Sequence, residues 1–162
     1  MNNKLNYPNW LVPLDIAQEL KAIGFNEPCL VTYNEVFDEE MIFISFEGDD
    51  YCYYYAELSE CSQRTNSEMG KDILETGKHY SYACSIPTWT DVLAWFRKKN
   101  LVGLVSYRYR DKNNKGFSFE ILDEDTDVFL YNTYEQAQEA LVYKLIEIYK
   151  SEQNESLHIR KD

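Results

Sequence analysis

The clearest structural pattern in this 162-residue chain lies in its second half. The stretch runs Leu101-Val102-Gly103-Leu104-Val105-Ser106-Tyr107-Arg108-Tyr109-Arg110 and, after Asp111-Lys112-Asn113-Asn114-Lys115-Gly116, continues Phe117-Ser118-Phe119-Glu120-Ile121-Leu122. Residue types alternate with a period of two in both halves, which is typical of strands. Asn and Gly in the connection tolerate the positive φ that hairpin turns need. The stretch therefore predicts an antiparallel hairpin.

The same alternation predicts which residues share a face of the hairpin. One face should hold Tyr107, Tyr109, Phe117, Phe119 and Ile121, and the other Arg108, Arg110, Ser118 and Glu120. Rings and guanidinium groups interleave along the first strand, as they do in platforms for single-stranded nucleic acid. Because the two kinds fall on opposite faces, we expect Arg108 to pair with Glu120 within the sheet instead.

Helices and strands elsewhere in the chain follow from periodicity and end signals. Helices are expected over 13–23, where Pro13 and Gly24 mark the ends, over 88–99 after a Thr88 cap, and over 134–150 after a capping box that begins at Thr133. Strands are expected at 29–33, 41–46, 51–58, 80–86 and 128–131, with an acidic connection at 35–40 and an acidic hairpin turn at 47–50. Between them, the polar loop 59–77 has room for a helical turn near 69–74.

The order of these elements is typical of an α+β fold. We expect a mainly antiparallel sheet of about six to seven strands, backed by three helices. A chain of this length matches one ordinary domain. The sequence therefore predicts a single domain over residues 1–150 and a flexible C-terminal tail over 151–162, where the helical pattern is lost.

Charge is the feature of the sequence that points beyond folding. Residues 1–60 contain 12 acidic and 2 basic residues, whereas residues 61–162 contain 16 acidic and 14 basic ones. The formal net charge is −12, and only residues 97–115 reverse the sign, with seven basic residues and one acidic residue. Such acidity repels phosphate, which argues against nucleic-acid or anionic-membrane partners.

Motifs of metal, cofactor and membrane proteins are missing from the sequence. The cysteines, which lack any paired zinc spacing and which we expect to be mostly buried thiols, are Cys29, Cys52, Cys61 and Cys84. Alternating carboxylates at Asp123, Asp125 and Asp127 lack the glycine and the distant glutamate of an EF-hand loop. The chain shows neither a signal core nor about 18 consecutive apolar residues. We therefore expect a cytoplasmic protein without metal or cofactor.

Two hypotheses about function remain open at this point. The first is a non-enzymatic interaction protein that binds a basic host protein, or a second copy of itself, through an acidic, Tyr-rich surface. The residues of that surface would be Glu39, Glu40, Asp49, Asp50, Tyr53 and Tyr55. The alternative is a small-molecule-binding protein or modest enzyme with a pocket near the 59–77 loop that includes His79 and Tyr80, because imidazole exchanges protons near neutral pH. No nucleophile is identifiable beside His79, so catalysis is not expected.

Three stretches of the chain together carry a resemblance. They are Val12 to Cys29, Pro87 to Lys99, and Thr133 to Glu147. In these stretches the chain resembles a group of small acidic proteins of unassigned activity that are carried by bacteriophages and integrated elements of anaerobic gut bacteria. The resemblance implies an accessory or host-facing role, but it supplies no catalytic or binding residue.

Overall fold

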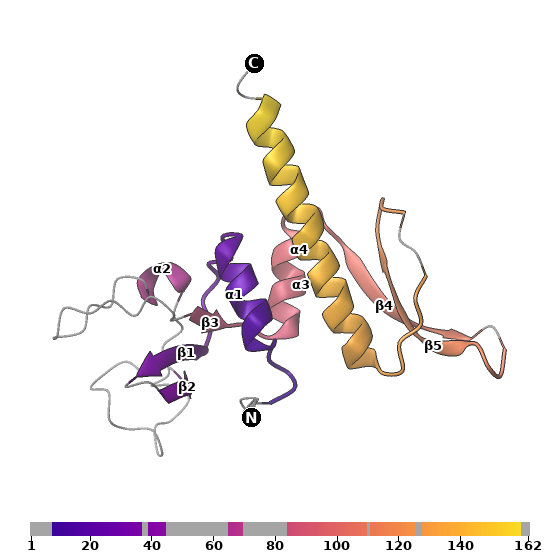
Figure 1. Ribbon diagram of the computed structural model, residues 1–162, viewed down its shortest axis with the longest axis horizontal. Helices are drawn as coiled ribbons and strands as arrows, with labels where there is room; N and C mark the ends of the chain where they lie inside the picture. The colour runs from indigo at the N-terminus through magenta and orange to yellow at the C-terminus, as the bar shows by residue number, and fades with distance from the viewer. Residues whose placement is uncertain are drawn as a thin grey trace. The chain divides into compact units, whose positions relative to one another are not determined.

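The computed structural model describes residues 8–36, 39–44, 65–69, 84–109, 111–125 and 128–159 (Figure 1). The chain divides into two compact units, residues 1–91 (unit 1) and residues 92–162 (unit 2), and each is described by itself. Both units combine helices with antiparallel strands, which confirms the expected α+β class. The single-domain boundary at residue 150 stays a prediction.

Unit 1 contains a three-stranded antiparallel sheet. Its strands are β1 (Val31–Val36), β2 (Glu39–Ile44) and β3 (Cys84–Ile86), in the order β2-β1-β3. The pairing of β1 with β2 extends to the last register pair, Val36 with Glu39. Most of the acidic segment 35–40 is therefore paired strand, so the expected bounds of this connection are wrong. The ladder continues through the acidic residues and leaves only residues 37 and 38 between the strands.

Helix α1 (Leu14–Ala22) contacts β3 and confirms the helix expected over 13–23. Its side chains Ile16, Ala17 and Leu20 are at most 1% exposed, so one stripe of the helix enters the core. Gly24 follows the helix with φ +90°, a conformation that a residue without Cβ adopts at little cost.

A short helix, α2 (Asn66–Met69), lies three residues before the helical turn expected near 69–74. Its first residue is buried. The Asn66 Nδ2 group donates to the carbonyl oxygen of Phe25 at 2.7 Å, and Asn66 Oδ1 accepts from the backbone N–H of Ser85 at 3.0 Å. One side chain thus ties α2 both to the segment after α1 and to β3.

Helix starts follow the predicted caps. At the start of α3 (Trp89–Arg97), the N–H of Asp91 donates to Thr88 Oγ1 and the N–H of Thr88 donates to Asp91 Oδ2, both at 3.1 Å. At the start of α4 (Tyr134–Ile159), the N–H of Gln136 donates to Thr133 Oγ1 at 3.2 Å. These bonds satisfy backbone donors that have no partner inside the first helical turn.

Unit 2 is built on the hairpin of β4 (Gly103–Tyr109) and β5 (Lys115–Ile121), with α4 packed on both strands (Figure 1). The register pairs Tyr107 with Phe117 and confirms the predicted sharing of faces. The part of α3 that belongs to unit 2 packs on α4 through edge-to-face ring contacts. The centroid distances between the two helices are 5.2 Å for Trp95 with Tyr149 and 6.4 Å for Phe96 with Tyr149. Within α3, the ring centroids of Trp95 and Phe96 lie 5.0 Å apart.

The expected single sheet of six to seven strands is wrong, because the described residues form a three-stranded sheet and a separate two-stranded sheet. Of the expected strands, the run 51–58 and residues 80–83 lie outside the described residues. The segment 128–131 reaches β5 only through one bridge, between Tyr131 and Phe117. Periodicity identifies a strand but not its partner, since partner choice depends on packing between distant segments.

Two local expectations are also corrected. Positive φ among the described residues occurs at Gly24, Asn100 and Asp123, and not in the hairpin connection. There, Asp111 Oδ1 accepts from the backbone N–H groups of Asn113 and Asn114 at 2.8 and 3.0 Å and closes the turn. The last helix continues to Ile159 instead of ending near 150, because its polar extension contains neither Gly nor Pro and grows from an established helix.

Candidate interaction surfaces

The residues proposed for an acidic, Tyr-rich surface are only partly within the described structure. Glu39 and Glu40 are the first residues of β2, where Glu40 is the register partner of Glu35 in β1. The other candidate residues lie outside the described residues and stay predictions: Asp49, Asp50, Tyr53 and Tyr55 of the surface, and His79 and Tyr80 of the alternative pocket.

The net charge of the chain is concentrated in unit 1. Residues 1–91 contain 16 acidic and 5 basic residues, a formal charge of −11, whereas residues 92–162 contain 12 and 11, a formal charge of −1. In the part of unit 1 that the structure describes, Lys21 is the one basic residue. The acidic residues there are Asp15, Glu19, Glu27, Glu35, Glu39, Glu40, Glu68 and Asp91. Acidic residues thus outnumber basic ones eight to one in this part of unit 1.

Some of these carboxylates also accept hydrogen bonds inside unit 1. Asp91 Oδ2 accepts from the backbone N–H and the hydroxyl of Thr88, and Asp15 Oδ1 accepts from the N–H of Ile16 at 3.0 Å. Such bonds to neutral donors do not cancel the charge of a carboxylate. The hydrogen bonds therefore leave the formal negative charge of unit 1 as it is.

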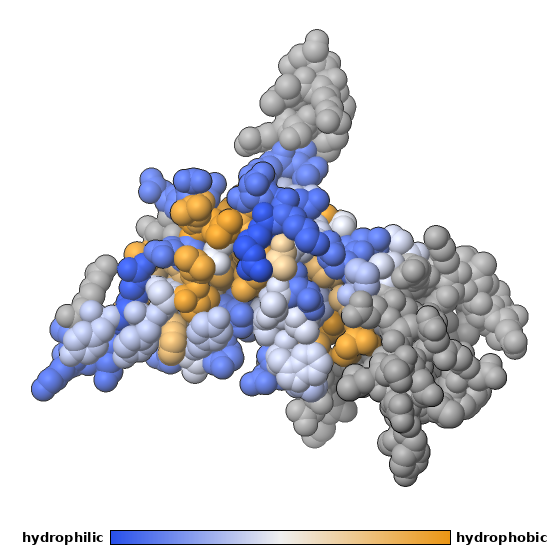
Figure 2. Space-filling model, turned by 180° about the vertical axis from the view of Figure 1, so that it is seen from behind, coloured by the Kyte–Doolittle hydropathy of each residue, from blue (hydrophilic) through white to orange (hydrophobic). Residues whose placement is uncertain are grey.

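Unit 2 exposes large apolar side chains, and Figure 2 shows hydrophobic residues, in orange, gathered at its surface on the side of the hairpin. The exposed residues are Leu104, Tyr107 and Tyr109 in β4, Leu122, Val128, Phe129 and Leu130 after β5, and Tyr134 and Tyr143 in α4. Apolar residues that gather at a surface are typical of contact sites. One signal of this surface is present in the sequence, since the run 128–130 is apolar on both alternating faces.

The basic groups near this surface are partly neutralised within the hairpin. One guanidinium nitrogen of Arg108 lies 2.7 Å from Glu120 Oε2, and its Nε donates to Ser118 Oγ at 3.2 Å. This confirms the pairing expected from the alternation of residues. Since the Arg108 side chain lies over β5, it is not available as a free cationic platform for nucleic acid.

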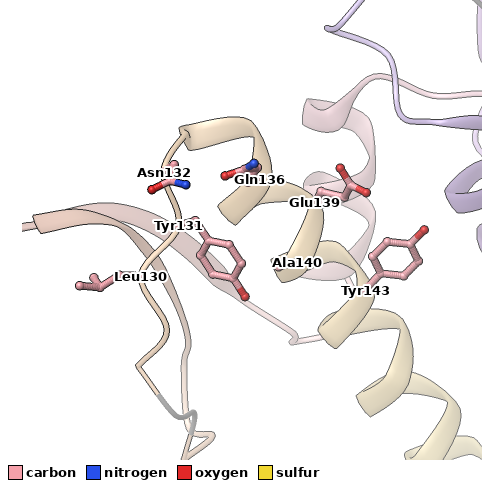
Figure 3. Close-up of a pocket in the computed structure, with 7 residues that line it drawn as sticks. All are labelled: Leu130, Tyr131, Asn132, Gln136, Glu139, Ala140 and Tyr143. Carbon is pink, nitrogen blue, oxygen red and sulfur yellow. The ribbon is translucent and has the colours of Figure 1, made fainter.

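An open hollow of about 470 Å³ in unit 2 lies between residues 130–132 and α4 (Figure 3). Its lining residues are Leu130, Tyr131, Asn132, Gln136, Glu139, Ala140 and Tyr143. The ring of Tyr131 lies alongside the helix near Ala140, and Leu130 points away from it. One carboxylate, two phenols and two amides can form hydrogen bonds there, but they do not make a nucleophile with an adjacent base.

A second hollow, of about 310 Å³, lies in unit 1 and includes Cys29 in its lining. Burial raises the pKa of Cys29 to about 12 and the pKa of Cys84 to about 11. Both thiols are therefore protonated at neutral pH, and neither is a thiolate nucleophile. They confirm the expectation of buried thiols for these two residues. Cys52 and Cys61 lie outside the described residues.

Among the residues with described structure, no three His, Cys, Asp or Glu side chains gather in a way that would hold a metal ion. A search of that same part of the chain finds no helix with the length and apolarity needed to cross a membrane. No protein-family model, curated protein or solved structure matches the chain.

Proposed function

We propose that this chain is a non-enzymatic interaction protein whose acidic unit 1 docks on a basic surface of another protein. The observation that carries the proposal is the division of charge, −11 in residues 1–91 against −1 in residues 92–162. A field of one sign steers an oppositely charged partner during diffusional encounter and disfavours like-charged partners. Binding to a basic protein is therefore the simplest function for this unit.

The chemistry of the described residues supports binding more than catalysis. The Cys29 and Cys84 thiols are protonated, and the hollow in unit 2 is wide open to solvent. Free thiols at both positions also fit a reducing compartment, so we place the protein in the cytoplasm. Together with the resemblance described above, this favours an accessory protein of a phage or integrated element.

The test compares two triple variants of the full chain in affinity capture from a bacterial lysate. In the first variant, Glu35, Glu39 and Glu40 of unit 1 become Gln. In the matched control, the exposed Glu135, Glu139 and Glu152 of α4 become Gln, which removes the same total charge from unit 2. The captured protein is identified, and its affinity for each purified variant is measured by calorimetry.

We expect the partner to be basic, to be released by raised salt, and to bind the unit 1 variant about tenfold more weakly, since each lost charge contact contributes roughly 0.5 kcal/mol. The control should bind like the natural chain. A partner that is acidic, that is indifferent to salt, or that loses affinity equally for both variants would contradict the proposal.

A further inference from the structure

The hollow that includes Cys29, here called the unit 1 hollow, combines exposed and buried apolar side chains. Trp10 and Leu30, which line it, are 52% and 38% exposed. The lining also includes the buried residues Leu11, Cys29 and Ile86. Its volume of about 310 Å³ lies at the lower end of the range for ligand sites, about 300–1,000 Å³. A hollow of this size suits one long side chain of a partner better than a large cofactor.

The backbone around Trp10 is held by hydrogen bonds to the segment that leads into α3. The C=O of Trp10 accepts from the N–H of Trp89 at 3.4 Å, and the N–H of Val12 donates to the C=O of Pro87 at 3.1 Å. The indole N–H of Trp89 donates to the C=O of Asn9 at 2.9 Å. An exposed indole on a fixed backbone loses little entropy on binding, and tryptophan is among the residues that contribute most to protein interfaces.

Among the described residues, Asp91 is the one charged residue that lines the unit 1 hollow. Its Oδ2 accepts from the backbone N–H and the hydroxyl of Thr88, at 3.1 and 2.7 Å. Because both of these donors use Oδ2, the other carboxylate oxygen, Oδ1, can accept from a partner. The full negative charge of Asp91 also outweighs the partial positive charge of the nearby helix start, which is about half an elementary charge.

The charges that act in the unit 1 hollow are negative. Burial is the largest cause of the raised pKa of Cys29, and the negative charges of Asp91 and Glu27 raise it further. Within the described part of unit 1, no basic residue lines the hollow. A cation with an apolar stem is therefore complementary to the hollow, whereas a carboxylate or phosphate is repelled.

We propose that the unit 1 hollow receives one arginine side chain of the basic partner protein, an inference that rests on the docking function proposed for unit 1. The aliphatic stem of the arginine packs against Leu11 and Leu30. Its guanidinium group stacks on the ring of Trp10 and donates to Asp91 Oδ1. Arginine suits the site better than lysine, because the planar guanidinium stacks on an indole and is less strongly hydrated than an ammonium group.

The test is an NMR titration of the full chain with capped tripeptides that differ only in the central residue. That residue is arginine, lysine, or citrulline, which has the shape of arginine without its charge. We expect the arginine peptide to shift the indole N–H signal of Trp10 and the amide signals of Leu30 and Asp91. It should bind about threefold more tightly than the lysine peptide and about tenfold more tightly than the citrulline peptide.

Two variants locate the binding in the unit 1 hollow. Trp10→Ala removes the stacking ring and should weaken the arginine peptide about tenfold. Asp91→Asn removes the charge but keeps an oxygen that accepts from Thr88, and it should weaken the peptide about three- to fivefold. The matched control is Asp15→Asn, which makes the same change in the first turn of α1, outside the lining, and should alter the affinity by less than about twofold.

The spectrum of each variant shows directly whether it is folded. An arginine peptide that binds no better than the lysine or citrulline peptide would overturn the proposal, as would equal losses in the Asp91 and Asp15 variants. These titrations do not use the docking partner. A failure of the peptides therefore overturns the arginine site and leaves the docking function standing, whereas capture of an acidic or salt-indifferent partner overturns the docking function whatever the peptides do.

Discussion

The position of the short helix α2 depends on the buried side-chain amide of Asn66. It donates to the Phe25 carbonyl and accepts from the Ser85 N–H, and both of these partners belong to other segments of unit 1. Asn66→Ala leaves the two backbone groups without their partner in a buried site. We expect the free energy of unfolding to fall by about 1–3 kcal/mol for each stranded group, measured by urea denaturation.

The matched control for this change is the neighbouring Ser67→Ala. Ser67 is exposed, and it bonds to Asn26 Oδ1 through its backbone N–H, which alanine keeps. We expect a change within about 0.5 kcal/mol. If the two variants lost the same stability, the amide of Asn66 would not have the structural role assigned to it.

The two buried thiols predict a loss of stability at alkaline pH. Burial raises the pKa of Cys84 and Cys29 from 9.0 to about 11 and about 12. Above pH 9 the unfolded chain therefore releases protons that the folded chain retains, and the free energy of unfolding falls as pH rises toward 11–12. Below pH 9 the thiols are protonated in both states and contribute no pH dependence.

Urea titrations of the natural chain and of the double variant Cys29→Ala, Cys84→Ala at several pH values measure this effect. Tyrosines and lysines titrate in the same range, so the difference between the two proteins isolates the thiols. We expect a constant difference below pH 8 and a natural chain that loses stability faster above pH 9. Parallel curves throughout would show that the thiols ionise equally in both states.

At the scale of the element, Gly116 permits the bridge between β5 and the segment 128–131. A Cβ at this position would lie 2.7 Å from the carbonyl oxygen of Tyr131, closer than van der Waals contact allows. Gly116→Ala should push Tyr131 away from Phe117 and cost about 1–3 kcal/mol of stability. Faster amide exchange of Phe117 and Tyr131, measured by NMR, would locate the damage at their two shared hydrogen bonds.

Lys115→Ala is the control for the glycine change, since Lys115 is the exposed neighbour in the same strand. Its substitution should leave both amides protected. Unchanged exchange in the Gly116 variant would mean that the segment adapts to a Cβ without losing the bridge.

The elements that the sequence predicted correctly are those defined by local signals. Pro13 and Gly24 enclose α1, Thr88 and Thr133 cap α3 and α4, and strict alternation defines the hairpin. The bounds of β1 and β2 were predicted wrongly, because the paired ends of these strands contain acidic residues that a local pattern assigns to a connection. How strongly two strands pair depends on both of them and cannot be predicted from either strand alone.

Surface exposure was the least predictable property of the candidate sites. Residues 128–130 have the composition of a covered strand, yet the bridge to β5 is made by the next residue, Tyr131, and all three side chains are exposed. The exposure of a segment depends on which other segment packs against it, and the periodicity of its own residues does not identify that segment. Conversely, the pairing of Arg108 with Glu120 was predictable, because both residues belong to one local hairpin.

At the scale of the whole molecule, the formal charge is divided unequally between the two units. The docking function rests on the −11 charge of residues 1–91, whose reach in solution shrinks to about 10 Å at 0.1 M salt. Residues 92–162 have a formal charge of −1 and contribute little to this field. Charge changes confined to unit 2 should therefore leave the docking affinity unchanged.

The length of α4 offers a practical attachment point. The helix runs to Ile159, and its residues 150–154 are all exposed to solvent. A cysteine introduced at Ser151 would carry a fluorophore on a regular helix without entering the hydrophobic core of unit 2. Because the native Cys29 and Cys84 thiols are buried and protonated, maleimide labelling should favour the engineered site over both of them.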